Sequence, residues 1–228
     1  MLHQFRDSPF CEKVRRVLHF KRRHFEVREV PPTDALSRLR RLNPVGKVPV
    51  LEHAGEVICD SSRIARHIDD AFPEPPLFPV DSRDRALVEL IEDWADESLY
   101  FFEVFFRFGL KDNAEESSRR ASQSEPPLLR RATEAAMPTF MRSVLRAQGL
   151  GRKAPEQVLE EFDHRLGSLT HWLGPNDWLV GRSLTLADIA VYAQLAGVAD
   201  TGEGAAVLGD RPTLLDWMAR VNGATAPS

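Results

Sequence analysis

The stretch Ser8-Pro9-Phe10-Cys11 lies between an apolar segment at residues 2–5, typical of a short strand, and a helical pattern over residues 12–21. The apolar residues of that pattern recur at helical spacing, so one face of the helix is expected to be buried. A polar group at such a strand-to-helix junction faces the unpaired amides and the positive end of the helix dipole. The sequence therefore predicts an anion-binding position at the start of the first helix.

Short strands and helices alternate through the first third of the chain. Strands are predicted at residues 2–5, 25–30, 48–52 and 56–59, and helices at residues 12–21, 34–42 and 61–72. The last two strands are separated by His53-Ala54-Gly55, a connection of hairpin length. The order β-α-β-α-β-β-α predicts a mixed four-stranded sheet made of a parallel pair and an antiparallel hairpin.

A proline-rich linker divides the chain. The four prolines in residues 73–79 cannot continue a helix, so we expect a domain boundary near residues 75–82, with domains at 1–76 and 83–228. Helices are predicted in the second domain at residues 83–108, 128–148, 155–173, 185–199 and 212–221. Pro138 should kink or divide its helix, and the polar residues 111–127 are expected to form an exposed loop. The predicted fold class is α/β plus all-α.

Composition limits the function classes. The 228-residue chain has a net charge of −4, which argues against a general nucleic-acid partner. Its two cysteines cannot make a disulfide framework and are typical of a reducing cytoplasm. We see no secretory signal and no apolar run of the roughly 20 residues that cross a bilayer. We expect a cytoplasmic protein that uses no metal and binds neither nucleic acid nor membrane.

The hydroxyl of Ser8 is suited to stabilising a thiolate. A free thiol has a pKa of about 8.5, and lowering it by about two units requires roughly 2.7 kcal/mol of preference for the anion. A helix terminus supplies up to about 2 kcal/mol, and a hydrogen bond to a charged acceptor about 1.5–3 kcal/mol. We find no histidine and acid pair spaced to make Ser8 a nucleophile, so Ser8 is expected to donate to a bound thiolate. The alternative is that Ser8 only caps the helix.

Cys11 stands where a Cys-x-x-Cys redox motif would place its second cysteine. Because Ser8 occupies the first position, two-cysteine exchange within the motif is excluded. Cys11 is then either a small buried apolar residue or a reactive thiol, and Cys59 at a strand end has the same alternatives.

Two dipeptides could bind an extended, peptide-like ligand. Val48-Pro49 precedes a strand, and a cis bond there would turn the main-chain groups of Val48 outward. Asp60-Ser61 offers a carboxylate for an ammonium group, and a hydroxyl with a helix N-terminus for a carboxylate. This combination suits the zwitterionic end of a γ-glutamyl group. The alternative is an ordinary helix cap.

These motifs carry a family resemblance. The chain resembles the cytosolic glutathione transferases over essentially its full length, through residues 8–11, 13–15, 43–51, 60–61 and 181–188, of which residues 43–51 are the most specific. The resemblance implies a thioredoxin-like domain followed by an all-helical bundle domain, usually assembled as a homodimer. Within residues 181–188, Thr185 and Asp188 have the spacing of a capping box, so we assign them a structural role.

The resemblance also implies roles for particular residues. Ser8 takes the place of the family's activating group, and the implied glutathione-binding residues are Lys47, Val48, Pro49, Asp60 and Ser61. Val48 would contact the cysteinyl backbone of glutathione in cis-proline geometry. Asp60 and Ser61 would hold the γ-glutamyl end of glutathione. The candidate partners of the glycyl carboxylate are Arg38, Arg40 and Lys47.

The predicted helix at 83–108 is too aromatic on all sides to be only a core stripe. Some of its rings are expected to line a cleft that faces Ser8 and to favour flat, hydrophobic co-substrates. The candidate residues of this hydrophobic site are Phe10, Tyr100 and Phe105.

The leading hypothesis is a glutathione S-transferase. Glutathione binds as co-substrate, Ser8 stabilises its thiolate, and the thiolate is conjugated to a small hydrophobic electrophile. Isomerase and dehalogenase reactions would begin with the same step. The alternatives are a glutathione-dependent thiol reductase that acts through Cys11 and a non-catalytic binding module that keeps the fold.

Overall fold

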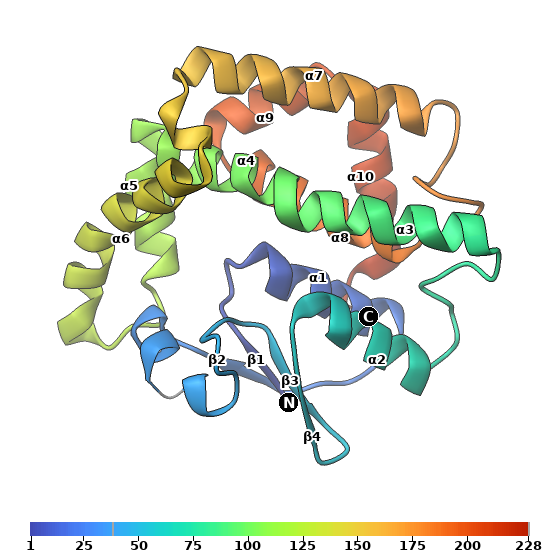
Figure 1. The fold of residues 1–228 in the computed structure, drawn as a ribbon, viewed down its shortest axis with the longest axis horizontal. Helices are drawn as coiled ribbons and strands as arrows, with labels where there is room; N and C mark the ends of the chain where they lie inside the picture. Colours follow the sequence, from blue (N-terminus) through green and yellow to red (C-terminus); the bar gives the residue numbers. More distant parts are fainter. Residues whose placement is uncertain (38, 228) are drawn as a thin grey trace.

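The first part of the chain folds around a four-stranded sheet with the order β2-β1-β3-β4 (Figure 1). The computed structural model describes residues 1–37 and 39–227. Strand β1 (Leu2–Gln4) pairs in parallel with β2 (Val27–Glu29) and antiparallel with β3 (Val50–His53). Strand β4 (Glu56–Cys59) completes the antiparallel hairpin with β3. The predicted mixed sheet is confirmed.

Helices α1 (Pro9–Phe20) and α2 (Ser61–Ala71) lie between this sheet and the rest of the molecule (Figure 1). Helix α1 begins at a proline, whose fixed φ suits the first helical position. The β3–β4 connection is tight because Ala54 and Gly55 both take positive φ, 52° and 84°, as a two-residue hairpin turn of type I′ requires.

The chain beyond residue 81 is helical. A continuous helical segment comprises α3 (Ser82–Trp94), a π-helical stretch (Ala95–Leu99), α4 (Tyr100–Val104) and a second π-helical stretch (Phe105–Gly109). In the described chain six α-helices follow, with a short 3₁₀ helix (Leu150–Arg152) between the second and the third: α5 (Lys111–Ala121), α6 (Pro127–Gln148), α7 (Pro155–Leu173), α8 (Leu186–Ala199), α9 (Gly202–Gly209) and α10 (Pro212–Thr225). The structure therefore has the expected thioredoxin-like part followed by a helical part. None of the described helices is long and apolar enough to span a membrane.

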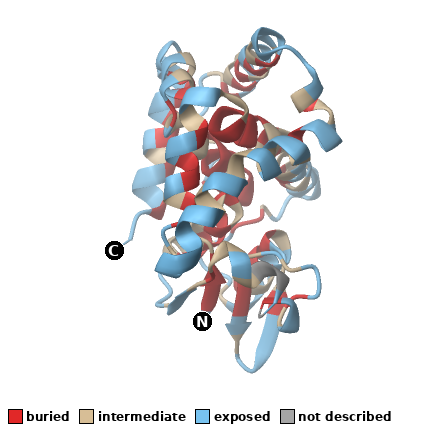
Figure 2. Ribbon diagram, turned by 90° about the vertical axis from the view of Figure 1, so that its left-hand side faces the viewer, coloured by how far each residue is buried: buried red, intermediate tan, exposed pale blue. Residues whose placement is uncertain are grey.

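Helix α8 is the centre of the helical part, since eleven of its 14 residues are buried. The buried ribbon is concentrated in the interior of the molecule in Figure 2. Helix α8 packs against α1 and α10 on one side and against α3 on another. The apolar composition of residues 185–199 led us to expect this central position, because a helix that is hydrophobic all round must be covered all round.

The predicted helix over residues 34–42 is wrong. The described part of this segment forms two short 3₁₀ helices, Pro32–Leu36 and Leu39–Arg41. Leu39 and Leu42 pack beside Val30. A separation of three residues is one full turn of a 3₁₀ helix, so this conformation places both leucines on the same side.

The predicted exposed loop at residues 111–127 is also wrong, because α5 occupies most of it. The buried face of α5 consists of small residues at helical spacing, namely Ala114, Ser117, Ser118 and Ala121. The Ser118 hydroxyl donates to the Ala114 carbonyl at 2.6 Å, so its polarity is satisfied inside the helix. Small side chains allow α5 to pack closely although the segment has low hydropathy.

Pro138 does not divide its helix, since α6 runs without interruption from Pro127 to Gln148. Helix α9 was not predicted, because its glycine-rich sequence lacks a clear apolar stripe. The predicted strand at residues 25–30 is shorter, as only Val27–Glu29 pair with β1.

Asp188 joins the start of α8 to two other segments. Its carboxylate accepts hydrogen bonds from the Thr185 amide and from the Leu179 amide, both at 2.9 Å. It also accepts from the indole of Trp217 on α10 at 2.9 Å. Burial raises the pKa of Asp188, and these hydrogen bonds act against that rise. The capping box predicted from the sequence is present and extends into the core.

We predict that Asp188→Ala lowers the free energy of unfolding by about 3–5 kcal/mol, because several buried donors lose their acceptor together. Thr185→Ala should cost about 1–2 kcal/mol, as the loss of a cap does. Urea denaturation measures both. The matched control is Asp81→Ala at the exposed cap of α3, where the loss should stay near 1 kcal/mol. Equal losses at Asp188 and Asp81 would contradict the structural role.

Candidate functional site

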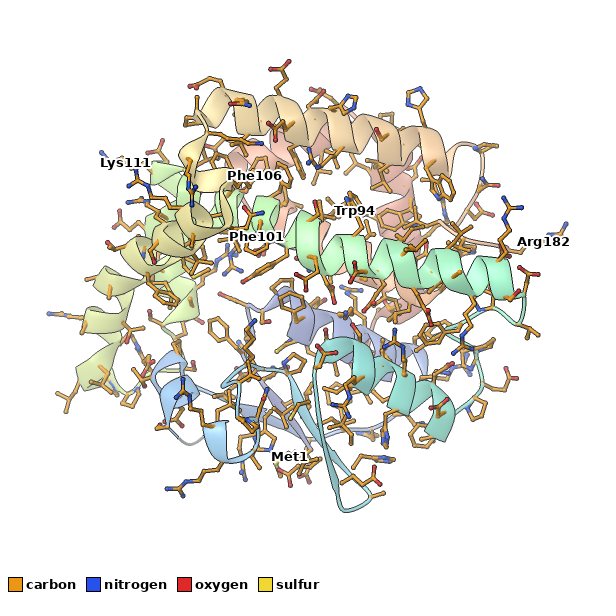
Figure 3. The ribbon with its side chains drawn as sticks, in the orientation of Figure 1. Met1, Trp94, Phe101, Phe106, Lys111 and Arg182 are labelled. Carbon is orange, nitrogen blue, oxygen red and sulfur yellow. The ribbon has the colours of Figure 1, made fainter. Side chains whose placement is uncertain are left out.

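A cavity of about 390 Å³ is lined by residues from both parts of the chain. The first part contributes Ser8, Phe10, Lys47 and Val48, and the second contributes Tyr100, Phe101, Phe108, Met137 and Met141 among others. The helix that carries Trp94, Phe101 and Phe106 passes directly over the first part (Figure 3). The first part therefore contributes Ser8 and Lys47 among mainly apolar neighbours, and the second part combines rings and methionines with charged side chains, which include Asp96, Glu103 and Arg107.

Ser8 is half-buried and caps α1. Its Oγ accepts a hydrogen bond from the Cys11 amide at 3.4 Å. A hydroxyl has one proton and two lone pairs, so this bond uses a lone pair and leaves the proton free to donate. The two alternatives considered for Ser8, helix cap and thiolate donor, are compatible in this geometry.

Cys11 does not reach the cavity. Its side chain has no exposed surface, and its Sγ lies 3.5 Å from the Phe5 amide. Burial raises the pKa of the Cys11 thiol to about 11, although the hydrogen bonds from Phe5 and Ser8 act in the opposite direction. The geometry favours the buried apolar alternative for Cys11 over the reactive one. Cys59 is half-buried, and its thiol donates to the Leu42 carbonyl at 3.5 Å.

Asn43 organises the loop that presents Lys47 and Val48 to the cavity. Its amide donates to the Lys47 carbonyl at 2.7 Å, and its Oδ1 accepts from the Val45 amide at 3.1 Å. The Val48-Pro49 bond is cis, as considered from the sequence. Within the described chain, the Val48 amide donates to no other backbone group, so it remains available to an extended ligand. The sequence did not indicate the role of Asn43, which depends on this loop geometry.

Asp60 and Ser61 lie at the turn between β4 and α2 rather than in the cavity wall. Asp60 is exposed and has a φ of 79°, and its carboxylate accepts from the Ser62 and Arg63 amides, both at 3.1 Å. Ser61 is the first residue of α2 and is buried. The cap expected as the alternative is present, while one carboxylate oxygen, Oδ2, takes no part in it.

The three candidate residues of the hydrophobic site differ in position. Phe10 and Tyr100 line the cavity with their ring centroids 4.8 Å apart. Phe105 is buried outside the cavity. Its ring packs against that of Phe106 and fills the space that a Cβ at Gly109 would occupy. The reason is the π-helical stretch, whose wider turn changes which side chains face the first domain.

The three candidate partners for a glycyl carboxylate differ in position. Lys47 is exposed and lines the cavity, whereas Arg40 is exposed and does not. Arg38 lies outside the described residues. Among the described residues, no group of three histidine, cysteine, aspartate or glutamate side chains is arranged to hold a metal ion.

A buried ionic cluster lies beside the cavity. The Lys13 ammonium donates to Glu92 at 2.7 Å and to Asp96 at 2.5 Å, and to the Ser62 hydroxyl at 3.3 Å. Burial raises the pKa of Asp96 to about 6, and the Lys13 charge limits that rise. Asp96 also lines the cavity. Sequence patterns did not reveal this cluster, because its members come from three separate helices.

The comparisons with known proteins agree with this architecture. Residues 2–76 match the family model "Glutathione S-transferase, N-terminal domain", and residues 132–224 match "Glutathione S-transferase, C-terminal domain". The chain belongs to the glutathione S-transferase family. Members of this family bind glutathione, and the resemblance inferred from the sequence motifs is confirmed.

Two relatives within the glutathione S-transferase family match most of this chain in sequence. FtsZ-localized protein A of Caulobacter vibrioides is 29% identical over 199 residues, covering 86% of this chain and 75% of that protein. Protein LigF of Sphingobium sp. is 28% identical over 203 residues, covering 82% and 74%.

Two crystal structures show the same fold. β-Etherase LigF from Sphingobium sp. has a TM-score of 0.70 at 24% identity, covering 97% of this chain and 93% of that chain. A glutathione S-transferase from Methylobacterium radiotolerans, crystallised with glutathione sulfonate, has a TM-score of 0.64 at 23% identity, covering 99% and 93%.

We predict that Cys11 resists alkylation in the folded protein. A thiol pKa raised from 9.0 to about 11 reduces its thiolate fraction near neutral pH about 100-fold, and burial also blocks access. Iodoacetamide at pH 8 followed by peptide mass spectrometry should label Cys59 first, and both cysteines equally after denaturation. Labelling of native Cys11 as fast as Cys59 would support the thiol reductase alternative instead.

Proposed function

We propose that this protein is a glutathione transferase that binds glutathione at the start of α1, stabilises its thiolate with the Ser8 hydroxyl and directs it to a hydrophobic electrophile. The observation that carries the proposal is the shared cavity, in which Ser8 and Val48 face the aromatic wall around Tyr100. Membership of the glutathione S-transferase family supports the identity of the co-substrate.

Glutathione would lie along the edge formed by three segments of the first domain. The free Val48 amide would pair with its cysteinyl backbone, as an added strand pairs with a sheet edge. The Asp60 carboxylate would pair with the γ-glutamyl ammonium, and the Ser61 hydroxyl at the α2 N-terminus would meet its carboxylate. Of the two candidates that the structure describes, Arg40 and Lys47, only Lys47 lines the cavity, so Lys47 would pair with the glycyl carboxylate.

The thiolate would then be stabilised by two groups that need no reorganisation. The start of α1 would offer its dipole and the Phe10 amide to the sulfur, since Pro9 has no N–H and the Cys11 amide already donates to Ser8 Oγ. The Ser8 proton, which the cap leaves free, would donate to the sulfur. Donors that are already oriented toward a developing or existing anion are an effective way to stabilise it.

The electrophile is expected to be aromatic or otherwise flat and apolar. The second-domain wall combines the rings of Tyr100, Phe101 and Phe108 with the flexible side chains of Met137 and Met141. Aromatic walls favour stacked or edge-to-face contact with a ring, and methionines adapt to irregular shapes. Attack of the thiolate would form a carbon–sulfur bond and expel a leaving group with the bonding electron pair, or add to an activated double bond.

One specific relative suggests a second reaction of the same type. LigF, whose crystal structure is described as a β-etherase, is 28% identical over 82% of this chain. In an ether cleavage the same thiolate would displace an aryl oxide. A panel that contains an aryl halide and a β-aryl ether therefore distinguishes two leaving groups for one mechanism.

We predict that Ser8→Ala raises the pKa of enzyme-bound glutathione by about 1–2 units, because a hydrogen bond to a charged group contributes about 1.5–3 kcal/mol. Thiolate absorbance of the glutathione complex measured against pH gives this value without any electrophile. Ser8→Thr keeps the hydroxyl and should largely retain the low pKa. The control is Ser168→Ala on the exposed face of α7. An unchanged titration in Ser8→Ala would remove Ser8 from the mechanism.

We predict that Asp60→Asn weakens glutathione binding about 10-fold or more, because it removes a charge from the pairing with the ammonium group. Asparagine also caps helices and tolerates positive φ, so the free energy of unfolding should change by less than about 0.5 kcal/mol. Titration calorimetry and urea denaturation measure the two quantities. Unaltered affinity would refute the assignment, and failure of the wild-type protein to bind glutathione would refute the transferase proposal itself.

A further inference from the structure

Arg107 connects the helical domain to the loop that carries Ser8. Its Nη1 donates to the Asp7 main-chain carbonyl at 2.8 Å and to Glu103 Oε1 at 2.8 Å. Its Nη2 lies 3.6 Å from the Asp7 carboxylate. Asp7 directly precedes Ser8, so one guanidinium touches the residue next to the proposed thiolate donor.

This contact is buried and polar in a mainly apolar wall. The Arg107 side chain is 8% exposed and that of Glu103 is 1% exposed. Burial raises the pKa of Glu103, and the Arg107 charge opposes that rise. Replacing a buried ion pair with apolar residues is often neutral or stabilising, so stability alone does not explain why a charged pair stands here.

The surroundings are shaped to hold Glu103 in this place. Gly197 on α8 faces it, and a Cβ at that position would lie only 2.6 Å from Glu103 Oε1. Glu103 is in α4, and Arg107 is one turn later in the π-helical stretch Phe105–Gly109. π-Helical turns inside α-helices occur frequently at functional sites, where they reorient side chains.

We propose that Arg107 is a positioning residue for Ser8: held by Glu103, its guanidinium fixes the Asp7 carbonyl and thereby the orientation of the Ser8 hydroxyl. The hydroxyl is then restrained from both sides, by the Cys11 amide that it accepts from and by the chain segment that precedes it. A loop donor held in this way needs less ordering when the sulfur arrives. The inference rests on the proposed function, since it assumes that Ser8 meets the glutathione sulfur.

Arg107 would act on Ser8 through geometry rather than through its charge, because neighbouring carboxylates compensate the charge of the guanidinium. Glu103 and Asp7 both lie against the guanidinium, so Arg107 offers no net positive field to a thiolate. The planar fork of arginine can reach a carbonyl and a carboxylate at once, which a lysine ammonium does with less fixed geometry. Arg107→Lys therefore keeps the charge and removes the restraint.

The test is the thiolate titration of the glutathione complex in Arg107→Lys. We expect its midpoint to rise by about 0.5–1 pH unit, which is about a 3- to 10-fold loss of thiolate near neutral pH. In the background of Ser8→Ala the same substitution should give no further shift, because the restraint then has no hydroxyl to orient. Glu103→Gln, which keeps the shape of the side chain, should shift the midpoint in the same direction and decides the matter if Arg107→Lys does not fold.

Arg211→Lys is the matched control. Arg211 also donates to a main-chain carbonyl, that of Val207 at 2.8 Å, and pairs with a carboxylate, that of Asp163, but it does not line the cavity. Its loss should affect stability without moving the titration. A shift of similar size in Arg211→Lys would show a general loosening of the fold and overturn the inference.

Two further outcomes would overturn it. A shift from Arg107→Lys that is equally large with and without the Ser8 hydroxyl would mean that Arg107 does not act through Ser8. An unmoved titration combined with a raised KM for the electrophile would make Arg107 a substrate contact instead. The proposed function fails separately, if Ser8→Ala itself leaves the titration unchanged.

Discussion

The Lys13 ammonium group, which is 1% exposed, connects the two parts of the molecule. It extends from α1 to the carboxylates of Glu92 and Asp96 on the long helical segment and to the Ser62 hydroxyl on α2. An ammonium group at such depth is tolerated only when its partners are all in place, and removal of one partner of a buried pair costs about 3–5 kcal/mol. The cluster therefore restricts how α1, α2 and the long helix are placed relative to one another, and the cavity lies beside it.

The cavity beside this cluster is lined by both parts of the chain, and each part contributes different groups. The first domain contributes the start of α1 and the free main-chain amide of Val48, because the loops after β1 and before β3 end at the cavity. The second contributes rings from the long helical segment, which packs against α8, and the methionines Met137 and Met141 from α6. An anion could be held at the start of α1 while an apolar partner contacts the rings and methionines, and water is displaced by the apolar side. Electrostatic stabilisation is stronger in such a site than in open solvent.

The sequence-based predictions were right where the signal is local and wrong where packing decides. The β3–β4 hairpin, its Ala54-Gly55 turn and the capping box at Thr185 each depend on neighbouring residues, and all three are present. Small and polar residues carry little hydropathy, so the pattern of residues 111–127 predicts a loop, yet Ala114 and its neighbours pack closely enough to form α5. The aromatic composition of residues 83–108 does not reveal that Phe105 lies in a π-helical stretch and is buried outside the cavity.

The sequence by itself determined the family, the order of strands and helices along the first domain and the identity of Ser8, Val48 and Asp60 as candidate ligand-facing groups, because these depend on short motifs with fixed local geometry. Only the tertiary structure decided that Cys11 is buried, that Asn43 shapes the loop before the cis bond, and that Arg107 touches the residue beside Ser8. The physical reason is distance along the chain. Asp7 and Arg107 are separated by 100 residues, and a contact between them exists only after both domains have packed against each other.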